Sequence, residues 1–165
     1  MEESAPARRD AGHGARMLSA WRRLSTLPGG RRLFSRLVGR AAPYTGSIGA
    51  HVIALAPGRA EVQLRDRPRV RNHLRSVHAI ALANLGELAS GLAATTALPD
   101  GVRGIPTRIM IDYLKKARGT LTAYGTADLP AVTEPITAEV QARIVDGNGD
   151  IVAVVRVTWA LEPVS

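Results

Sequence analysis

The sequence predicts an α+β domain in which an antiparallel sheet covers one long apolar helix. Six separate segments alternate apolar and polar residues, which is the period of a β-strand with one buried face. One long apolar stretch, "HAIALANLGELASGLAATTA" at 78–97, lies between the second and third of these segments. A parallel α/β architecture would need helices between most of its strands, and the sequence shows no such alternation.

Turn residues separate the six strand candidates. "APGR" divides the first two, 48–54 and 60–64, which form a predicted hairpin with one polar face. "PDG" follows the helix candidate and leads to the other four strands, at 107–113, 121–127, 136–144 and 151–159. "DGNGD" joins the last two strands and predicts a tight hairpin, because glycine and asparagine adopt the positive φ values that such turns demand.

The chain is predicted to contain three regions: a disordered tail at 1–15, a basic amphipathic arm of two short helices at 16–41, and a main domain at 42–165. Residues 1–41 hold nine arginines and three acids, whereas the main domain has only two more basic than acidic residues. We expect the arm to pack its apolar stripe on the domain and leave its arginines in water. Contact with an anionic membrane surface or an acidic partner is the alternative.

The composition and motifs of the sequence exclude several classes of function and argue against others. The absence of cysteine excludes disulfides, thiolate metal sites and cysteine nucleophiles, and it agrees with a reducing, cytoplasmic location. The charge lies in the arm rather than on a face of the main domain, which argues against nucleic acid as a partner. The sequence has no glycine-rich phosphate loop, nucleophile elbow or dinucleotide fingerprint, and we expect neither a metal nor a cofactor.

The helix candidate carries a single charge, Glu87, on a face of small residues. A helical wheel places one apolar group toward the core: Ala81, Leu82, Leu85, Leu88, Ala89 and Leu92. The residues within about 60° of Glu87 on the same wheel are Ile80, Ala83, Asn84, Ser90, Gly91 and Ala94. An isolated glutamate either reaches water or pairs with an arginine. In a dry cleft, its pKa would instead rise and prepare it for general-base or nucleophilic work.

Asn72, His78 and Glu87 resemble the motif N-x5-H-G-G-x7-[DE] of hotdog-fold acyl-CoA thioesterases of the PaaI-like kind. "TRIMIDYLKKARGTLTAYG" is similar to the third and fourth strands of the same family, and the resemblance spans roughly residues 44–162. It implies a hotdog fold, with the sheet wrapped around the long helix. The arm before residue 42 lies outside this common core.

The sequence departs from the family pattern at three places. Ala79 and Ile80 replace the two glycines after the histidine, and Lys116 replaces a proline of the third strand. Gly91 stands where some relatives place a hydroxyl residue, and Ser90 precedes it. These departures concern the substrate and the activity more than the fold.

By analogy with the family, the backbone N–H of Ala79, together with that of Ile80, would polarise a thioester carbonyl at the helix N-terminus. Glu87 would activate water or attack the carbonyl directly, while His78 and Asn72 would position the site. The remaining residues that we expect near the substrate are Ser90, Gly91, Ile80, Asn84, Arg71 and Arg75. The two arginines belong to the basic run "RDRPRVRNHLR" and would contact coenzyme A phosphates, unless they are simply solvated.

The expected partner is an acyl-CoA or acyl-carrier thioester, with coenzyme A entering only as part of the substrate. Because the family forms its site between two subunits, we expect a homodimer, and a tetramer built as a dimer of dimers stays open. The main rival is a non-catalytic hotdog protein that binds acyl-CoA or a fatty acid, which the loss of both glycines favours. A protein that acts on membranes or nucleic acid through its basic arm is a third hypothesis.

Overall fold

The computed structural model describes residues 12–164, so most of the predicted tail lies outside the described residues. Its helices are α1 (His13–Ser25), α2 (Gly30–Ala41), α3 (Pro43–Gly46) and α4 (Ala79–Ala97), with a short 3-10 turn at Pro68–Val70. Its strands are β1 (His51–Ala56), β2 (Arg59–Leu64), β3 (Val102–Tyr113), β4 (Leu121–Thr126), β5 (Ile136–Val145) and β6 (Ile151–Pro163). Both arm helices and all six predicted strands are present.

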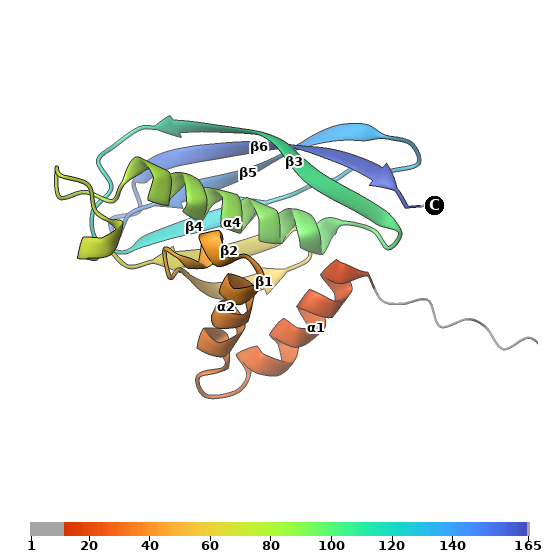
Figure 1. Ribbon diagram of the computed structural model, residues 1–165, viewed down its shortest axis with the longest axis horizontal. Helices are drawn as coiled ribbons and strands as arrows, with labels where there is room; N and C mark the ends of the chain where they lie inside the picture. Colours follow the sequence, from red (N-terminus) through yellow and green to blue (C-terminus); the bar gives the residue numbers. More distant parts are fainter. Residues whose placement is uncertain (1–11, 165) are drawn as a thin grey trace, which may run out of the picture.

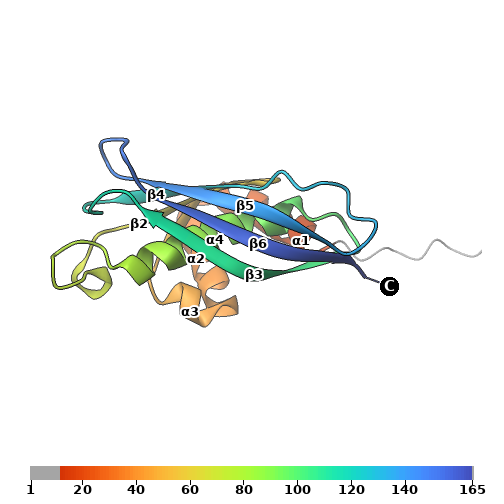
Figure 2. The same cartoon turned by 90° about the horizontal axis from the view of Figure 1, so that it is seen from above.

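The six strands form one antiparallel sheet in the order β1-β2-β4-β5-β6-β3. The long helix α4 runs across one face of the sheet (Figure 1), and it lies behind the strands when the molecule is seen from above (Figure 2). The predicted hotdog fold is therefore confirmed. The edges of the sheet are β1, against which α2 packs, and β3.

Three strand boundaries lie three or more residues from the prediction: the starts of β1 and β3, and the end of β6, which reaches Pro163 rather than residue 159. The first strand begins at His51 rather than at residue 48, because Gly49 takes a positive φ of 58° and ends a turn before the chain becomes extended. The third strand begins at Val102, five residues early, because it pairs with the extended C-terminal half of β6. β3 is consequently a long edge strand.

The core lies between α4 and the sheet, and the helical wheel predicted only part of it. The leucines Leu82, Leu85 and Leu92 are buried as expected, but Leu88 is only partly buried. Several residues assigned to the Glu87 face are buried instead: Asn84, Ser90 and Ala94. The wheel places residues by direction alone, whereas the curved sheet and the arm together cover more than half of the helix circumference.

The arm packs on the main domain, as expected. The rings of Trp21 and Phe34 meet edge to face with their centroids 5.1 Å apart, and both belong to the same buried cluster as the sheet residues. The hydroxyl of Ser35 donates to Arg31 O and accepts from Val52 N–H, which ties α2 to β1. No helix in the described part of the chain is long and apolar enough to cross a membrane.

Candidate functional site

The N-terminus of α4 is built by its own capping residue. The Nδ1 atom of His78 accepts the N–H of Ile80 at 3.1 Å, so His78 is the N-cap of the helix. This is a correction to the expectation for Ile80, because its N–H already has an acceptor and is not available to an oxyanion. The N–H groups of Ala79 and Ala81 have no acceptor among residues 12–164, and Ala79 is the first of these free donors at this end.

A loop organised by Asn72 presents this helix end. The Oδ1 atom of Asn72 accepts from Leu74 N–H at 2.9 Å and from both the N–H and the hydroxyl of Ser76 at 3.2 Å. His78 N–H then donates to Val70 O at 2.8 Å and fixes where the helix begins. Asn72 thus positions the loop through its carbonyl oxygen, which agrees with a positioning role at the site.

Tyr113 is a residue of this region that sequence patterns did not single out. It lies at the end of β3, and its hydroxyl donates to Ala79 O at 3.0 Å. The bond ties the edge strand to the first turn of α4. A tyrosine hydroxyl is protonated at neutral pH, and desolvation raises the pKa of Tyr113 further, so the hydroxyl remains a donor.

Glu87 lies two turns further along α4, half-buried in a cleft of about 440 Å³ between the helix and the arm. No donor among residues 12–164 lies within hydrogen-bond distance of its carboxylate. Burial raises the pKa of Glu87. The carboxylate therefore has the property that a general base or nucleophile requires: it is poorly solvated and has no partner to hold it ionised.

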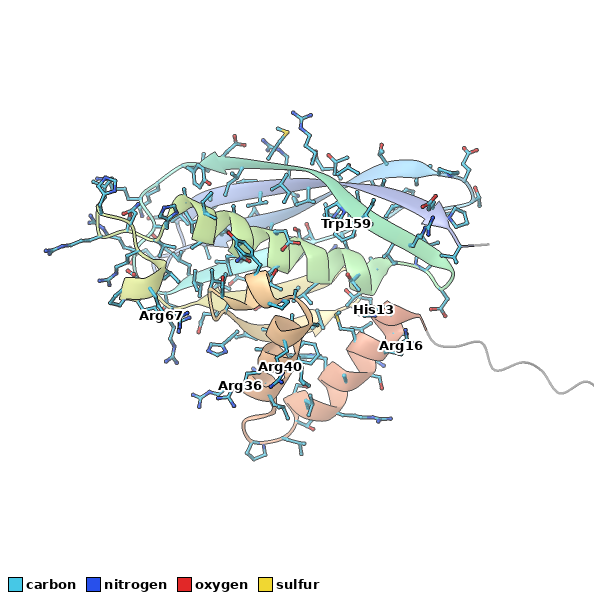
Figure 3. The ribbon with its side chains drawn as sticks, viewed as in Figure 1. His13, Arg16, Arg36, Arg40, Arg67 and Trp159 are labelled. Carbon is cyan, nitrogen blue, oxygen red and sulfur yellow. The ribbon has the colours of Figure 1, made fainter. Side chains whose placement is uncertain are left out.

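The walls of the Glu87 cleft are mostly apolar. They include side chains of the arm and of α4, namely Met17, Phe34, Leu37, Val38, Leu88 and Leu92. His13 and Arg16 of α1 and Trp159 of β6 also line it, and Figure 3 marks these three residues. Sequence reasoning missed all three, because His13 and Arg16 reach the cleft through the packing of α1 on α4 and Trp159 reaches it from β6. His13 had been assigned to the tail.

Gly91 opens the floor of this cleft, as the small-residue face predicted. A Cβ atom at this position would lie 3.7 Å from Glu87 Oε1 and 4.0 Å from Trp159 Cζ2. These are ordinary contact distances, so the glycine leaves a methyl-sized space next to the carboxylate. The indole N–H of Trp159 is buried and has no acceptor among the described residues.

Two of the expected substrate contacts are corrected by the structure. Ser90 is fully buried, and its hydroxyl donates to Glu87 O at 3.1 Å, so it faces the sheet side and cannot orient a water in the cleft. Asn84 is buried beneath α3, where its amide donates to Tyr44 O at 3.3 Å. Both residues lie within the predicted arc of the wheel, but neighbouring elements cover that part of the arc.

The other expected contacts lie at the N-terminal end of α4 rather than beside Glu87. The side chain of Ile80 is 55% exposed. Arg71 pairs with Asp66 at 2.6 Å, and this bond holds the pKa of Asp66 below its usual range. Arg75 is exposed in the same loop, with a positive φ of 55°. In the described part of the chain, no group of three or more His, Asp or Glu side chains is placed to hold a metal.

Comparisons with known proteins agree with this fold. The family model for the domain of unknown function DUF4442 matches residues 30–161. The crystal structure of the structural-genomics protein APC5556 is 31% identical, with a TM-score of 0.77, and the match covers 90% of this chain and 99% of that protein. No curated protein matches the chain in sequence.

Two more distant structures share the fold. A Pseudomonas aeruginosa protein described as a probable thioesterase has a TM-score of 0.71 at 18% identity, over 83% of this chain and 97% of its own. A mutant of the phenylacetic acid degradation protein PaaI from Thermus thermophilus has a TM-score of 0.61 at 24% identity, over 72% and 97% of the two chains. At these identities the likeness shows the fold alone.

Proposed function

We propose that the chain hydrolyses an acyl thioester, because it belongs to the DUF4442 family and has the hotdog fold of the thioesterase superfamily. Glu87 acts as the general base or as the nucleophile, and the N–H of Ala79 binds the developing oxyanion. The observation that carries this proposal is the half-buried carboxylate of Glu87, which has a raised pKa and no partner among the described residues. The reaction needs no cofactor, because coenzyme A or an acyl carrier is part of the substrate.

The spacing of these two groups requires two copies of the chain. Ala79 and Glu87 are eight residues apart on one helix, which is about 12 Å at 1.5 Å per residue. A base and an oxyanion donor that serve the same carbonyl must each lie about 3 Å from it. One chain therefore cannot supply both groups to one thioester. In a homodimer with antiparallel α4 helices, Ala79 of one copy would approach Glu87 of the other.

The exposed edge of β3 supports this homodimer. The strand has no neighbour on its outer side in the described sheet, and several of its apolar side chains are exposed: Ile105, Ile109, Met110 and Tyr113. Natural proteins rarely leave a long apolar edge strand uncovered. Antiparallel pairing of two β3 strands would continue the sheet across both copies and place their α4 helices side by side. Whether two such dimers associate into a tetramer stays open.

The acyl group would occupy the apolar cleft beside Glu87. Its walls are hydrophobic, and the space above Gly91 admits the carbonyl carbon close to the carboxylate. Hydrolysis forms a tetrahedral oxyanion, which the positive end of a helix and a free N–H stabilise. Glu87 then either takes a proton from water or forms an anhydride with the acyl group that water opens. Both routes release a carboxylic acid and a thiol.

The test measures thiol release from short, medium, long and aromatic acyl-CoA substrates. The wild-type protein should hydrolyse at least one of them, and Glu87→Gln should lower the rate about 10²- to 10⁴-fold. Glu139→Gln, an exposed glutamate of β5, is the matched control and should retain wild-type activity. If the wild type hydrolyses none of the acyl groups, either as coenzyme A thioesters or as acyl-carrier thioesters, the proposal that the protein is a thioester hydrolase is refuted. Equal activity of Glu87→Gln and wild type would refute the role of Glu87.

A non-catalytic acyl-binding protein is the second candidate. The observation in its favour is that His78 caps Ile80 N–H, which removes one of the two N–H donors that follow the histidine, where the resembled motif has two glycines. Calorimetric titration with a non-hydrolysable thioether analogue of acyl-CoA separates the two candidates. Binding of the analogue without turnover of the thioester supports the binding protein, whereas binding with turnover supports the enzyme.

A further inference from the structure

The helices of the arm carry a positive charge that no acid compensates locally. Between residues 11 and 50 the sequence contains seven arginines and no aspartate or glutamate. None of the ion pairs among residues 12–164 involves an arginine of α1, α2 or α3. Exposed helices commonly pair such charges with acids three or four residues away. The acids of the described residues therefore leave these arginines available to an external anion.

Three of these arginines share one flank of α2. Arg32, Arg36 and Arg40 are spaced four residues apart, so they lie in one row along the helix. The hydroxyl of Ser35 fixes α2 on β1, and this flank is therefore held beside the start of that strand. Figure 3 shows Arg36 and Arg40 on α2, and Arg67 on the segment that follows β2.

A second cleft, of about 670 Å³, lies between α2, α3 and β1. Arg36, Arg40 and His51 line it, together with the hydroxyl residue Ser47 and the backbone of Gly49. The Glu87 cleft adjoins it, since Leu88 and Val38 line both. The two clefts differ in charge, because Arg36 and Arg40 line the second one, whereas Arg16 and Glu87 line the first one.

Buried nitrogen atoms without partners lie beside this second cleft. The Nδ1 atom of His51 and the Nε atom of Arg67 are both buried and have no hydrogen-bond partner among the described residues. Gly49 makes room for Arg67, because a Cβ there would lie 2.2 Å from its Nη2 atom. The guanidinium thus lies against Gly49, which lines the cleft, and its Nη2 donates to Ile48 O and leaves Nε unused.

The electrostatic surroundings of His51 have one sign. Burial is the largest cause of the lowered pKa of His51. The pKa is lowered further by the charges of four arginines: Arg65, Arg32, Arg67 and Arg36. Every charged group that acts on the imidazole is thus an arginine, contributed by α2 and by the segment after β2. Four guanidinium groups around one histidine repel one another, so the arrangement has an electrostatic cost that an anion would remove.

We propose that this second cleft binds a phosphate ester, with Arg36 and Arg40 as its principal ligands, His51 in its lining and Arg67 behind Gly49. A phosphate group offers several acceptor oxygens and up to two negative charges, which suits guanidinium groups in a row. The nucleotide part of a coenzyme A thioester and the headgroup of an anionic lipid both present this chemistry. The site does not depend on the proposed hydrolysis, since it takes the phosphate end of a molecule and no reacting bond.

The first test titrates the protein with adenosine 3′,5′-bisphosphate in a calorimeter. The wild type should bind it, and Arg36→Gln with Arg40→Gln should weaken binding by about 100-fold, roughly tenfold for each lost guanidinium. Arg22→Gln with Arg23→Gln is the matched control, because it removes the same charge from exposed positions of α1 outside the cleft. That control should lose less than about threefold. Equal losses in both double variants would overturn the site.

A second test distinguishes the source of the phosphate. Vesicles of phosphatidylglycerol and of phosphatidylcholine are sedimented with the same three proteins. Retention on the anionic vesicles that requires Arg36 and Arg40, without binding of the bisphosphate, assigns the cleft to a lipid headgroup. Bisphosphate binding without such retention assigns it to a soluble nucleotide. A wild type that binds neither probe would overturn the proposal, as would vesicle retention that both double variants lose equally.

The imidazole of His51 provides a direct readout of the cleft. On addition of the ligand that binds, its Cε1–H resonance should shift more than that of His73 or His78, which lie in the loop before α4 and outside the cleft. An unchanged His51 signal at saturation would place the ligand elsewhere and refute the assignment.

Discussion

Gly125 of β4 allows α4 to lie unusually close to the sheet, and its replacement by alanine tests the packing that positions the candidate site. A Cβ at Gly125 would lie 2.1 Å from Ala89 O, 2.4 Å from Ala89 C and 2.9 Å from Ser90 N. All three atoms belong to the backbone of the helix turn that follows Glu87, so none of them can rotate away. The strand and the helix must separate to accept the methyl group.

The size of the effect follows from these distances. Favourable non-bonded contacts between carbon atoms lie near 3.5 to 4.0 Å, so a contact of 2.1 Å demands a displacement of more than about 1 Å. Overpacking of this kind costs typically 1–3 kcal/mol, and an unyielding backbone places Gly125→Ala near the upper limit, at about 3 kcal/mol. The reduced entropy of the unfolded chain returns about 0.4–1 kcal/mol. The net destabilisation is about 2 kcal/mol.

Thermal unfolding followed by circular dichroism measures this effect. For a chain of 165 residues, 1 kcal/mol corresponds to about 2–4 °C, so Gly125→Ala should lower the Tm by about 4–8 °C. Gly147→Ala in the turn between β5 and β6 is the control, because nothing lies within 4 Å of its added Cβ and its φ is not positive. Its Tm should change by less than about 2 °C. A Gly125→Ala Tm within that same range would refute the close approach of helix and strand.

Three further substitutions test the surroundings of Glu87. Burial raises the pKa of Glu87, so the ionised carboxylate destabilises the fold at high pH, and this cost is absent below the usual pKa of a glutamate. Glu87→Gln should therefore raise the Tm at pH 8 and leave it unchanged near pH 3. An equal rise at both pH values would contradict this explanation. Gly91→Ala should raise the free energy of unfolding in urea by about 1 kcal/mol, because alanine favours a helix interior and its Cβ would make only ordinary contacts. A lower free energy of unfolding would contradict the open space at this position. Trp21→Ala should cost about 3–5 kcal/mol in the same assay through loss of the buried ring against Phe34, and a cost below about 1 kcal/mol would mean that the arm does not share the core.

The sequence predicted the elements of the fold because hydrophobic period depends on local burial alone. Strands with one buried face alternate, and the helix between them repeats at a different period, so both were found without tertiary information. The same patterns could not identify what covers each surface. Ser90 and Asn84 were placed on the Glu87 face, yet the sheet and α3 cover them. Glu87 was found because it is the isolated charge of the helix.

The residues that sequence reasoning missed come from elements distant in the chain. His13 and Trp159 reach the Glu87 cleft from α1 and β6, and no local spacing connects them with the α4 motif. Sequence patterns also could not predict that His78 accepts the N–H of Ile80, because this bond depends on which nitrogen of His78 faces the backbone. The basic run before α4 drew attention to Arg71 and Arg75, whereas the arginines of α2 that surround His51 are spread over a separate helix. Charge density along the sequence is a poor guide to charge density in space.

Glu87 has no ion-pair partner among the described residues, although basic side chains are abundant in this chain. The chain has 22 basic side chains against 14 acids, and six ion pairs among the described residues connect arginine or lysine with Asp66, Asp112, Asp128, Asp146, Asp150 and Glu162. Arg16 lines the same cleft as Glu87 without pairing with it. A carboxylate that served only stability would gain from such a pair, whereas an ionised partner would lower its pKa and weaken it as a base. The unpaired state costs stability and preserves basicity, which is the arrangement expected of a reacting group.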